Sequence, residues 1–146
     1  MSNHLIRTFI SVTVPKEVIS LKEMVMTTVT FKGKNLKWVR TGQLHLTLKF
    51  IGYTPPDSIE EINNTLDNIV KRHHPINLSV NGTGCFPVPE RPRVLWLGIK
   101  DETNRMENLV MDINTSLDKL GFPIEEKEFT PHITIGRVIY PPKNTP

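Results

Sequence analysis

The stretches LHLTLKFIG (44–52) and EFTPHITIGRV (128–138) decide the fold. Each alternates polar with aliphatic or β-branched residues and runs into a glycine, a pattern that predicts a β-strand. Side chains on a strand alternate between its two faces. His45 and Thr47 therefore share one face, and the leucines beside them point to the other face, into a core. His132 follows the same rule, so each strand offers one imidazole and one hydroxyl to the same side.

Both strands belong to a unit that occurs twice. In each copy a strand that opens with arginine is followed by a helix and then by the H-x-T strand. Arg7 precedes His45 by 38 residues, and Arg93 precedes His132 by 39 residues. The sequence therefore predicts a single domain over residues 1–146, with two internal repeats at about 5–75 and 76–140. A pseudo-two-fold axis would set the two histidine strands face to face across a cleft.

Hydrophobic periodicity outlines the rest of the chain. We expect strands at 7–14, 36–40, 44–51, 76–80, 94–99 and 128–138, helices at 16–29, 59–73 and 104–120, and loops at 32–35, 81–84 and 86–92. Gly121 is predicted to close the third helix, and Pro131 to mark an edge or a bend in the last strand. The tail from residue 140 is expected to be loose. Alternating strands mixed with helices, without a regular βαβ order, favour antiparallel pairing and the α+β class.

Composition limits the function classes. The 18 basic and 15 acidic residues leave a net charge of +3, which permits an anionic ligand without demanding one. No block of Lys and Arg resembles a nucleic-acid tail, so recognition of a nucleic acid should be local, at one end. Cys85 is the only cysteine, which excludes an internal disulfide and a Cys-based zinc site. The first residues lack the features of a signal peptide, and no apolar run could span a bilayer, so we expect a cytoplasmic protein with no membrane partner.

Two imidazoles and two hydroxyls in one cleft suit the opening of a cyclic phosphodiester. Imidazole titrates near neutral pH, so one ring can take a proton from water while the other protonates the leaving ribose oxygen. The hydroxyls of Thr47 and Thr134 can donate hydrogen bonds to the non-bridging oxygens, where charge develops. We expect neither a metal nor a cofactor.

These residues resemble the 2H phosphoesterases, which carry one H-x-T-x motif in each half. More closely, the chain is similar to the RNA 2′,3′-cyclic phosphodiesterases, historically called 2′-5′ RNA ligases. The matching stretches are RTFI (7–10), WV (38–39), HLTLKFIG (45–52), GCFP (84–87), RVLWLG (93–98) and FTPHITIGR (129–137), together with Pro15. They extend over nearly the whole chain.

The resemblance implies a bilobal α+β fold, in which two antiparallel sheets line a central cleft and helices pack outside. It implies hydrolysis of RNA 2′,3′-cyclic phosphate ends to 2′-phosphomonoesters, and a weak reverse reaction that joins RNA ends through a 2′-5′ linkage. We expect the protein to be a monomer. The resemblance makes His45 the proton donor and His132 the proton acceptor, roles that the residues by themselves leave open. It also makes Arg137 a phosphate-binding residue. Simple alternation puts Arg137 on the opposite face from His132, and a bulge at Gly136 would turn it back.

Other side chains receive plainer interpretations. Lys49 either borders the cleft or is a solvated lysine at the strand end. Phe86, in a proline-rich loop, is a candidate for stacking on a base. The remaining assignments are the core for Phe9, Phe50 and Trp96, the surface or terminus for His4, His73 and His74, and a structural role for Arg7 and Arg93.

Three other functions fit parts of the pattern. A different 2H reaction, on a cyclic nucleotide or a 2′-5′ oligonucleotide, would use the same motifs with other loop contacts. A nucleotide-binding or RNA-binding module without turnover would not need both intact motifs. A zinc protein would need Cys or carboxylate ligands at a spacing that is not found near the histidines. The base preference and the physiological RNA are not encoded in any motif that we identify.

Overall fold

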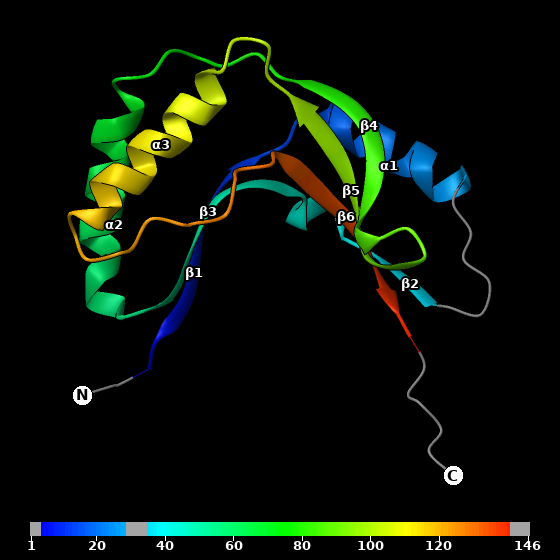
Figure 1. The fold of residues 1–146 in the computed structure, drawn as a ribbon, viewed down its shortest axis with the longest axis horizontal. Helices are drawn as coiled ribbons and strands as arrows, with labels where there is room; N and C mark the ends of the chain where they lie inside the picture. The colour runs from blue at the N-terminus through cyan, green and yellow to red at the C-terminus, as the bar shows by residue number, and fades with distance from the viewer. Residues whose placement is uncertain (1–3, 29–34, 141–146) are drawn as a thin grey trace. The chain divides into compact units, whose positions relative to one another are not determined.

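The computed structural model describes residues 4–28 and 35–140. The end of the expected first helix at residue 29, most of the expected turn at 32–35 and the tail beyond Tyr140 lie outside these residues. Within these residues, three α-helices and six strands follow one another (Figure 1). They are β1 (Ile6–Thr13), α1 (Lys16–Thr28), β2 (Asn35–Trp38), β3 (His45–Thr54), α2 (Ile59–Val70), β4 (Ser79–Val88), β5 (Arg91–Lys100), α3 (Arg105–Asp118) and β6 (His132–Ile139).

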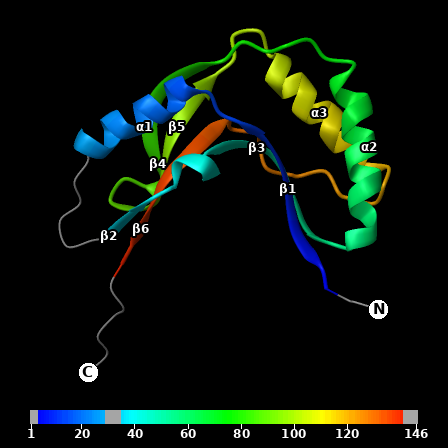
Figure 2. The ribbon, with the colours of Figure 1, turned by 180° about the vertical axis from the view of Figure 1, so that it is seen from behind.

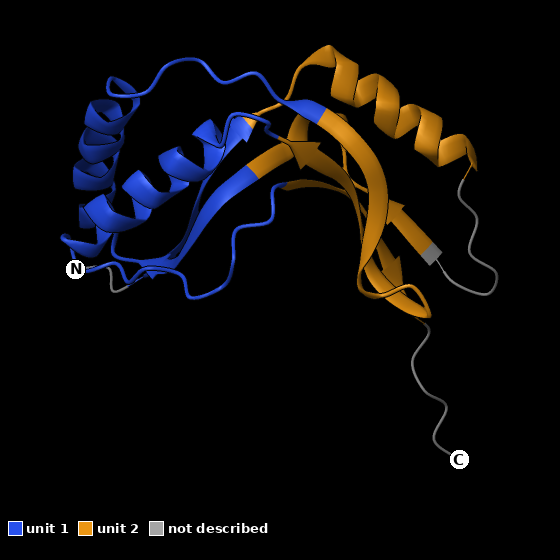
Figure 3. Ribbon diagram, turned by 45° about the horizontal axis from the view of Figure 1, so that its top comes forward, with its two compact units in different colours: residues 1–12, 47–79, 101–131 blue, residues 13–46, 80–100, 132–146 orange. Residues whose placement is uncertain are grey.

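The strands pair in the order β1-β3-β6-β5-β4, and β2 also pairs with β6. The described registers of β6 with β2, β3 and β5 are all antiparallel. The α+β class predicted from the sequence is therefore confirmed. Two compact units divide the chain (Figure 3). Unit 1 contains residues 1–12, 47–79 and 101–131, and unit 2 contains residues 13–46, 80–100 and 132–146. Each unit thus takes segments from both sequence repeats.

Unit 1 has its core where α2 packs against α3 (Figures 1 and 2). The buried side chains of α3 are spaced three or four residues apart, as one face of a helix requires. They are Met106, Leu109, Val110, Ile113 and Leu117. Gly121, with φ +97°, ends this helix as predicted. The amide of Phe122 donates to the carbonyl of Leu117 at 3.0 Å, and the amide of Gly121 donates to that of Asp118 at 3.0 Å, which is a Schellman motif.

Unit 2 is built around β6. Along its length β6 pairs with β5, from Val94↔Arg137 to Gly98↔His132, and its second half also pairs with β2. Aliphatic side chains of β5 and β6 form the buried face, among them Leu95, Leu97, Ile133 and Ile135. The prediction that Pro131 lies in an edge or bent strand was wrong. The strand begins immediately after this proline, so the missing amide costs no ladder hydrogen bond and β6 has neighbours on both sides.

Strand β4 replaces two predicted loops. Residues 81–84 and 86–88 continue the strand that we expected to stop at residue 80, and only Pro89 and Glu90 turn the chain into β5. Gly84, one of the two glycines that indicated a loop, serves packing instead, and so does Gly98 in β5. A Cβ on Gly84 would lie 2.3 Å from the Trp96 ring, and a Cβ on Gly98 would lie 2.6 Å from the carbonyl oxygen of Asn81. Glycine at these places lets the neighbouring groups approach closely.

Strand β3 departs from simple alternation. Leu48 and Lys49 are consecutive and both buried, and Phe50 is 57% exposed. Phe9 is 44% exposed and lies against Phe50, with ring centroids 6.1 Å apart, so the prediction that both phenylalanines belong to the core was wrong. Both interpretations of Lys49 were wrong as well. Its side chain is 1% exposed, and its ammonium donates to Asn114 Oδ1 at 2.6 Å and to the carbonyl of Pro123 at 2.9 Å.

Lys49 is thus a structural residue of unit 1. Burial lowers the pKa of its ammonium, and the opposing charges of Glu125 and Asp118 raise it in part. The charged form is tolerated because its protons meet the oxygen acceptors of Asn114 and Pro123.

Candidate active site

Four of the five predicted site residues lie in unit 2. These are His45, His132, Thr134 and Arg137, and the fifth, Thr47, is the first residue of the second segment of unit 1. His45 begins β3 and His132 begins β6. A buried aliphatic residue follows each histidine, and the histidines and both threonines are half-buried. The alternation expected of the two motifs is therefore present in both strands.

The pairing of β3 with β6 brings the motifs onto one face. Leu46 is paired with Ile133 in antiparallel register. Paired residues share a face, and their chain neighbours share the opposite one. His45, His132 and Thr134 therefore project from the same side of the β3–β6 pair. His45 and His132 are diagonal neighbours across it, a relation that sets Cα atoms about 7–8 Å apart in a regular pair.

A bulge in β6 turns Arg137 to the same face. Leu95 pairs with Gly136, but the next residue of β5, Trp96, pairs with Thr134, so Ile135 is an extra residue in β6. On β5, Val94 and Trp96 share a face because they are two residues apart. Val94 pairs with Arg137, so Arg137 lies on the face of Thr134 and His132. The register shift turns the arginine as the bulge expected at Gly136 would.

Lys37 joins this face, and sequence reasoning missed it. It pairs with Arg137 across the β2–β6 ladder, and both side chains are exposed. Its neighbour Trp38 pairs with Gly136 and occupies the opposite face, where a Cβ on the glycine would lie 3.2 Å from the indole. Lys37 lies only one residue before the matching stretch WV (38–39), but no pattern within a four-residue strand indicates the partner of that strand.

A hydrogen bond orients the His45 ring. Its Nδ1 lies 2.7 Å from the carbonyl oxygen of Gln43. A carbonyl oxygen can only accept, so Nδ1 carries the hydrogen of this bond and the lone pair of the neutral ring lies on Nε2. The short 3-10 turn Thr41–Gln43 places this carbonyl two residues before the histidine.

Aromatic rings support His132. The Phe86 ring meets it edge-on with centroids 5.2 Å apart, and the Trp96 ring lies 6.3 Å from it. Phe86 and Trp96 also pack on each other at 5.2 Å. Trp96 therefore belongs to the face of the histidines, which corrects its assignment to the core. Phe86 is 37% exposed and stands on β4, not in a loop.

We expect the close fit between Gly84 and Trp96 to make Gly84→Ala destabilising. The new methyl would overlap the indole, and overpacking of this kind typically costs about 1–3 kcal/mol. The melting temperature should fall by several degrees. Gly42→Ala is the matched control because no atom lies within 4 Å of its Cβ position. Equal melting temperatures for the two variants, measured by circular dichroism, would contradict the packing seen at Trp96.

Neither a metal cluster nor a membrane span is found within residues 4–28 and 35–140. No group of three or more His, Cys, Asp or Glu side chains gathers there as metal ligands would. None of the helices in these ranges has the length and hydropathy needed to cross a bilayer.

Sequence comparisons identify the relatives of this chain. Residues 12–96 match the family model of the LigT-like phosphoesterases. The RNA 2′,3′-cyclic phosphodiesterase of Thermotoga maritima is 38% identical over 136 residues, which cover 93% of this chain and 72% of that protein. The enzyme of the same name from Aquifex aeolicus is 35% identical over 91% of this chain and 71% of its own length.

Solved structures show the same fold. The crystal structure of TT0787 from Thermus thermophilus superimposes with a TM-score of 0.78 at 30% identity, covering 97% of this chain and 79% of that one. Escherichia coli LigT in complex with 3′-AMP superimposes with a TM-score of 0.72 at 21% identity, covering 97% of this chain and 78% of LigT.

Proposed function

The chain belongs to the LigT-like phosphoesterase family, and from this premise we propose that it is an RNA 2′,3′-cyclic phosphodiesterase that leaves a 2′-phosphomonoester. The observation that carries the proposal is the shared face of His45, His132 and Thr134 in unit 2, with Arg137 turned to it by the bulge. Relatives that are 29–38% identical over most of the chain bear the name of this activity. We further propose that the two sequence repeats act together as one catalytic domain.

The proposed mechanism divides proton transfer between the histidines. His132 takes a proton from water, which attacks the phosphorus, while His45 donates a proton to the ribose 3′ oxygen as the P–O3′ bond breaks. The hydrogen bond from Nδ1 to Gln43 supports this role for His45, because it leaves Nε2 as the site of proton exchange. Ligation would use the same roles with a 5′-hydroxyl in place of water: the hydroxyl loses its proton to His132 and attacks the phosphorus, O3′ leaves with a proton from His45, and a 2′-5′ linkage forms.

The phosphate is proposed to lie between cations and hydroxyls. Thr47 and Thr134 donate hydrogen bonds to the non-bridging oxygens, whose charge grows towards the transition state. Arg137, with Lys37 paired beside it, supplies positive charge. Phe86 is partly exposed and packed next to His132, a position suited to stacking on the terminal base.

The cellular setting is a separate proposal. We propose a cytoplasmic location, in keeping with the expectation from the sequence. The monomeric state expected from the sequence stays a prediction.

The product end tests the proposed reaction. We expect purified protein to convert a dinucleotide with a 2′,3′-cyclic phosphate into a single product, the 2′-phosphate, because in-line attack opposite a fixed acid selects one leaving oxygen. Phosphorus NMR against 2′- and 3′-phosphate standards identifies it. A 3′-phosphate would refute the RNA cyclic phosphodiesterase assignment and spare the two-histidine mechanism. An equal mixture of the two phosphates would count against the assignment and against the mechanism. The control is the uncatalysed opening of the cyclic phosphate in buffer.

A further inference from the structure

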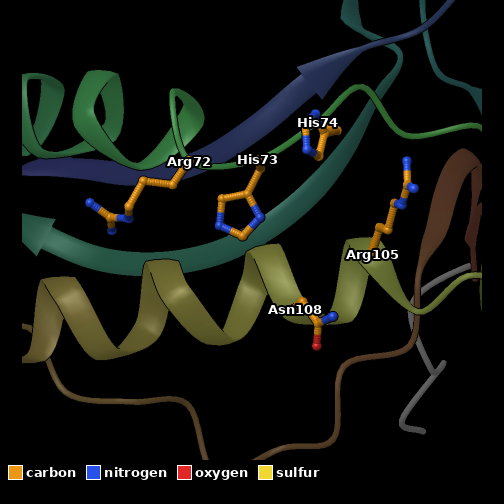
Figure 4. Close-up of a pocket in the computed structure, with 5 residues that line it drawn as sticks. All are labelled: Arg72, His73, His74, Arg105 and Asn108. Atoms are coloured by element: carbon orange, nitrogen blue, oxygen red, sulfur yellow. The ribbon is translucent and has the colours of Figure 1, made fainter.

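A second cationic site lies in unit 1, away from the histidine motifs in sequence. A pocket of about 110 Å³ is lined by Arg72, His73, His74, Arg105 and Asn108 (Figure 4). The first three residues follow the end of α2, and the other two lie on the first turn of α3. The proposed reaction uses none of these side chains.

The lining is basic. It contains two guanidinium groups and two imidazoles, and no carboxylate. Asp112 lies beside it and bonds two of its members. Arg72 Nη2 is 2.8 Å from Asp112 Oδ1, and His73 Nε2 is 2.7 Å from Oδ2. The hydrogen bond from Arg72 is the largest cause that lowers the pKa of Asp112, and His73 adds to it. Asp112 thus fixes the orientation of two of the four basic groups, Arg72 and His73.

The positive charge stays accessible. The Arg72 side chain is 53% exposed in spite of its ion pair. His74 and Arg105 are exposed, and the Arg105 guanidinium donates to the carbonyl of Pro75 across a long 3.4 Å. The amide of Met106 at the start of α3 already donates to Asp101 Oδ2 at 2.6 Å. Attraction for an anion therefore comes from the side chains and not from the helix end.

We propose that this pocket binds a phosphate group of an RNA strand, as a contact separate from the reactive end. The inference rests on the proposed function for its choice of RNA. Guanidinium groups bind phosphate through paired, charge-assisted hydrogen bonds, and the imidazoles and the Asn108 amide offer further donors. A phosphate in the strand carries no base information, so the pocket adds affinity without base preference.

The test separates strand binding from catalysis. The probe is a 5′-fluorescein oligoribonucleotide with several phosphates and a 3′-hydroxyl end. Its binding to the protein is measured by fluorescence anisotropy. The variant carries Arg105→Gln and His74→Gln, which leave the Arg72–Asp112 pair intact. We expect its Kd to rise about tenfold, as the loss of charge-assisted bonds implies. The slope of log Kd against log salt should fall by about 0.7, the value for one phosphate of a single strand.

Control measurements decide the interpretation. Lys127→Gln removes an exposed cation of unit 1 outside the pocket and should leave Kd nearly unchanged. Turnover of a cyclic-phosphate dinucleotide should stay at the wild-type rate in the double variant. An unchanged Kd in the double variant, or an equal loss in Lys127→Gln, would overturn the proposal. Inorganic phosphate could shift the NMR signals of the His73 and His74 rings while the double variant binds RNA like the wild type. That result would show that the pocket binds free anions and not RNA. Absence of turnover in the wild-type protein would refute the proposed function and leave this binding result to stand alone.

Discussion

Replacing His132 or His45 with alanine is expected to lower kcat on a cyclic-phosphate dinucleotide by about 10²–10⁴-fold, the contribution that general acid–base catalysis typically makes. Both rings lie on the same face of the β3–β6 pair. Each would move a different proton, so neither can replace the other. The two single variants should be similarly inactive, and the double variant only slightly worse, because residues that act as a unit are not additive.

The pH dependence of the rate distinguishes a histidine that transfers a proton from one that only stabilises the fold. Wild-type kcat/KM should follow a bell, since one ring must be neutral while the other is protonated. Each alanine variant should lose one limb of the bell in its residual activity. His4→Ala is the control, because this histidine is exposed and lies in unit 1, outside both proposed sites. Circular dichroism and thermal melts would report the fold. More than about a tenth of wild-type rate in a folded His45 or His132 variant would rule out the acid–base pair.

Thr134→Val is expected to have the next largest effect, a fall in kcat of about 10²-fold with little change in KM. Valine keeps the β-branched shape on β6 and removes the hydroxyl. A donor aimed at developing charge acts mainly in the transition state, and the loss of one such donor typically costs about 10²–10³ in kcat. Thr47→Val should act in the same direction.

A strand threonine outside the site provides the control. Thr8, on β1, donates its hydroxyl to the carbonyl of Ile6 at 2.9 Å, and Thr8→Val should leave kcat unchanged. Steady-state and single-turnover rates would separate binding from chemistry. A raised KM at constant kcat in Thr134→Val would show that the hydroxyl binds the ground state and the transition state equally.

The local features of this protein follow from its sequence. The alternation of polar and apolar residues predicted which side chains of the two H-x-T motifs share a face, because side chains on a strand repeat every two residues. Helical spacing predicted the buried face of α3. Gly121 predicted the end of this helix, because the left-handed backbone conformation that closes a helix favours glycine. The repeated motif also indicated the chemistry before any contact was known.

Tertiary pairing decided the rest. Which face Arg137 occupies depends on whether β6 carries an extra residue opposite β5, and the sequence offered only Gly136 as a hint. Lys37 enters the site only because β2 pairs with β6, and Trp96 only because it pairs with Thr134. Lys49 is buried because α3 and the segment after it supply oxygens 65 and 74 residues further along the chain. Patterns within a strand report which residues share a face, but strand partners and registers are set by the packing of distant segments, which no local period encodes.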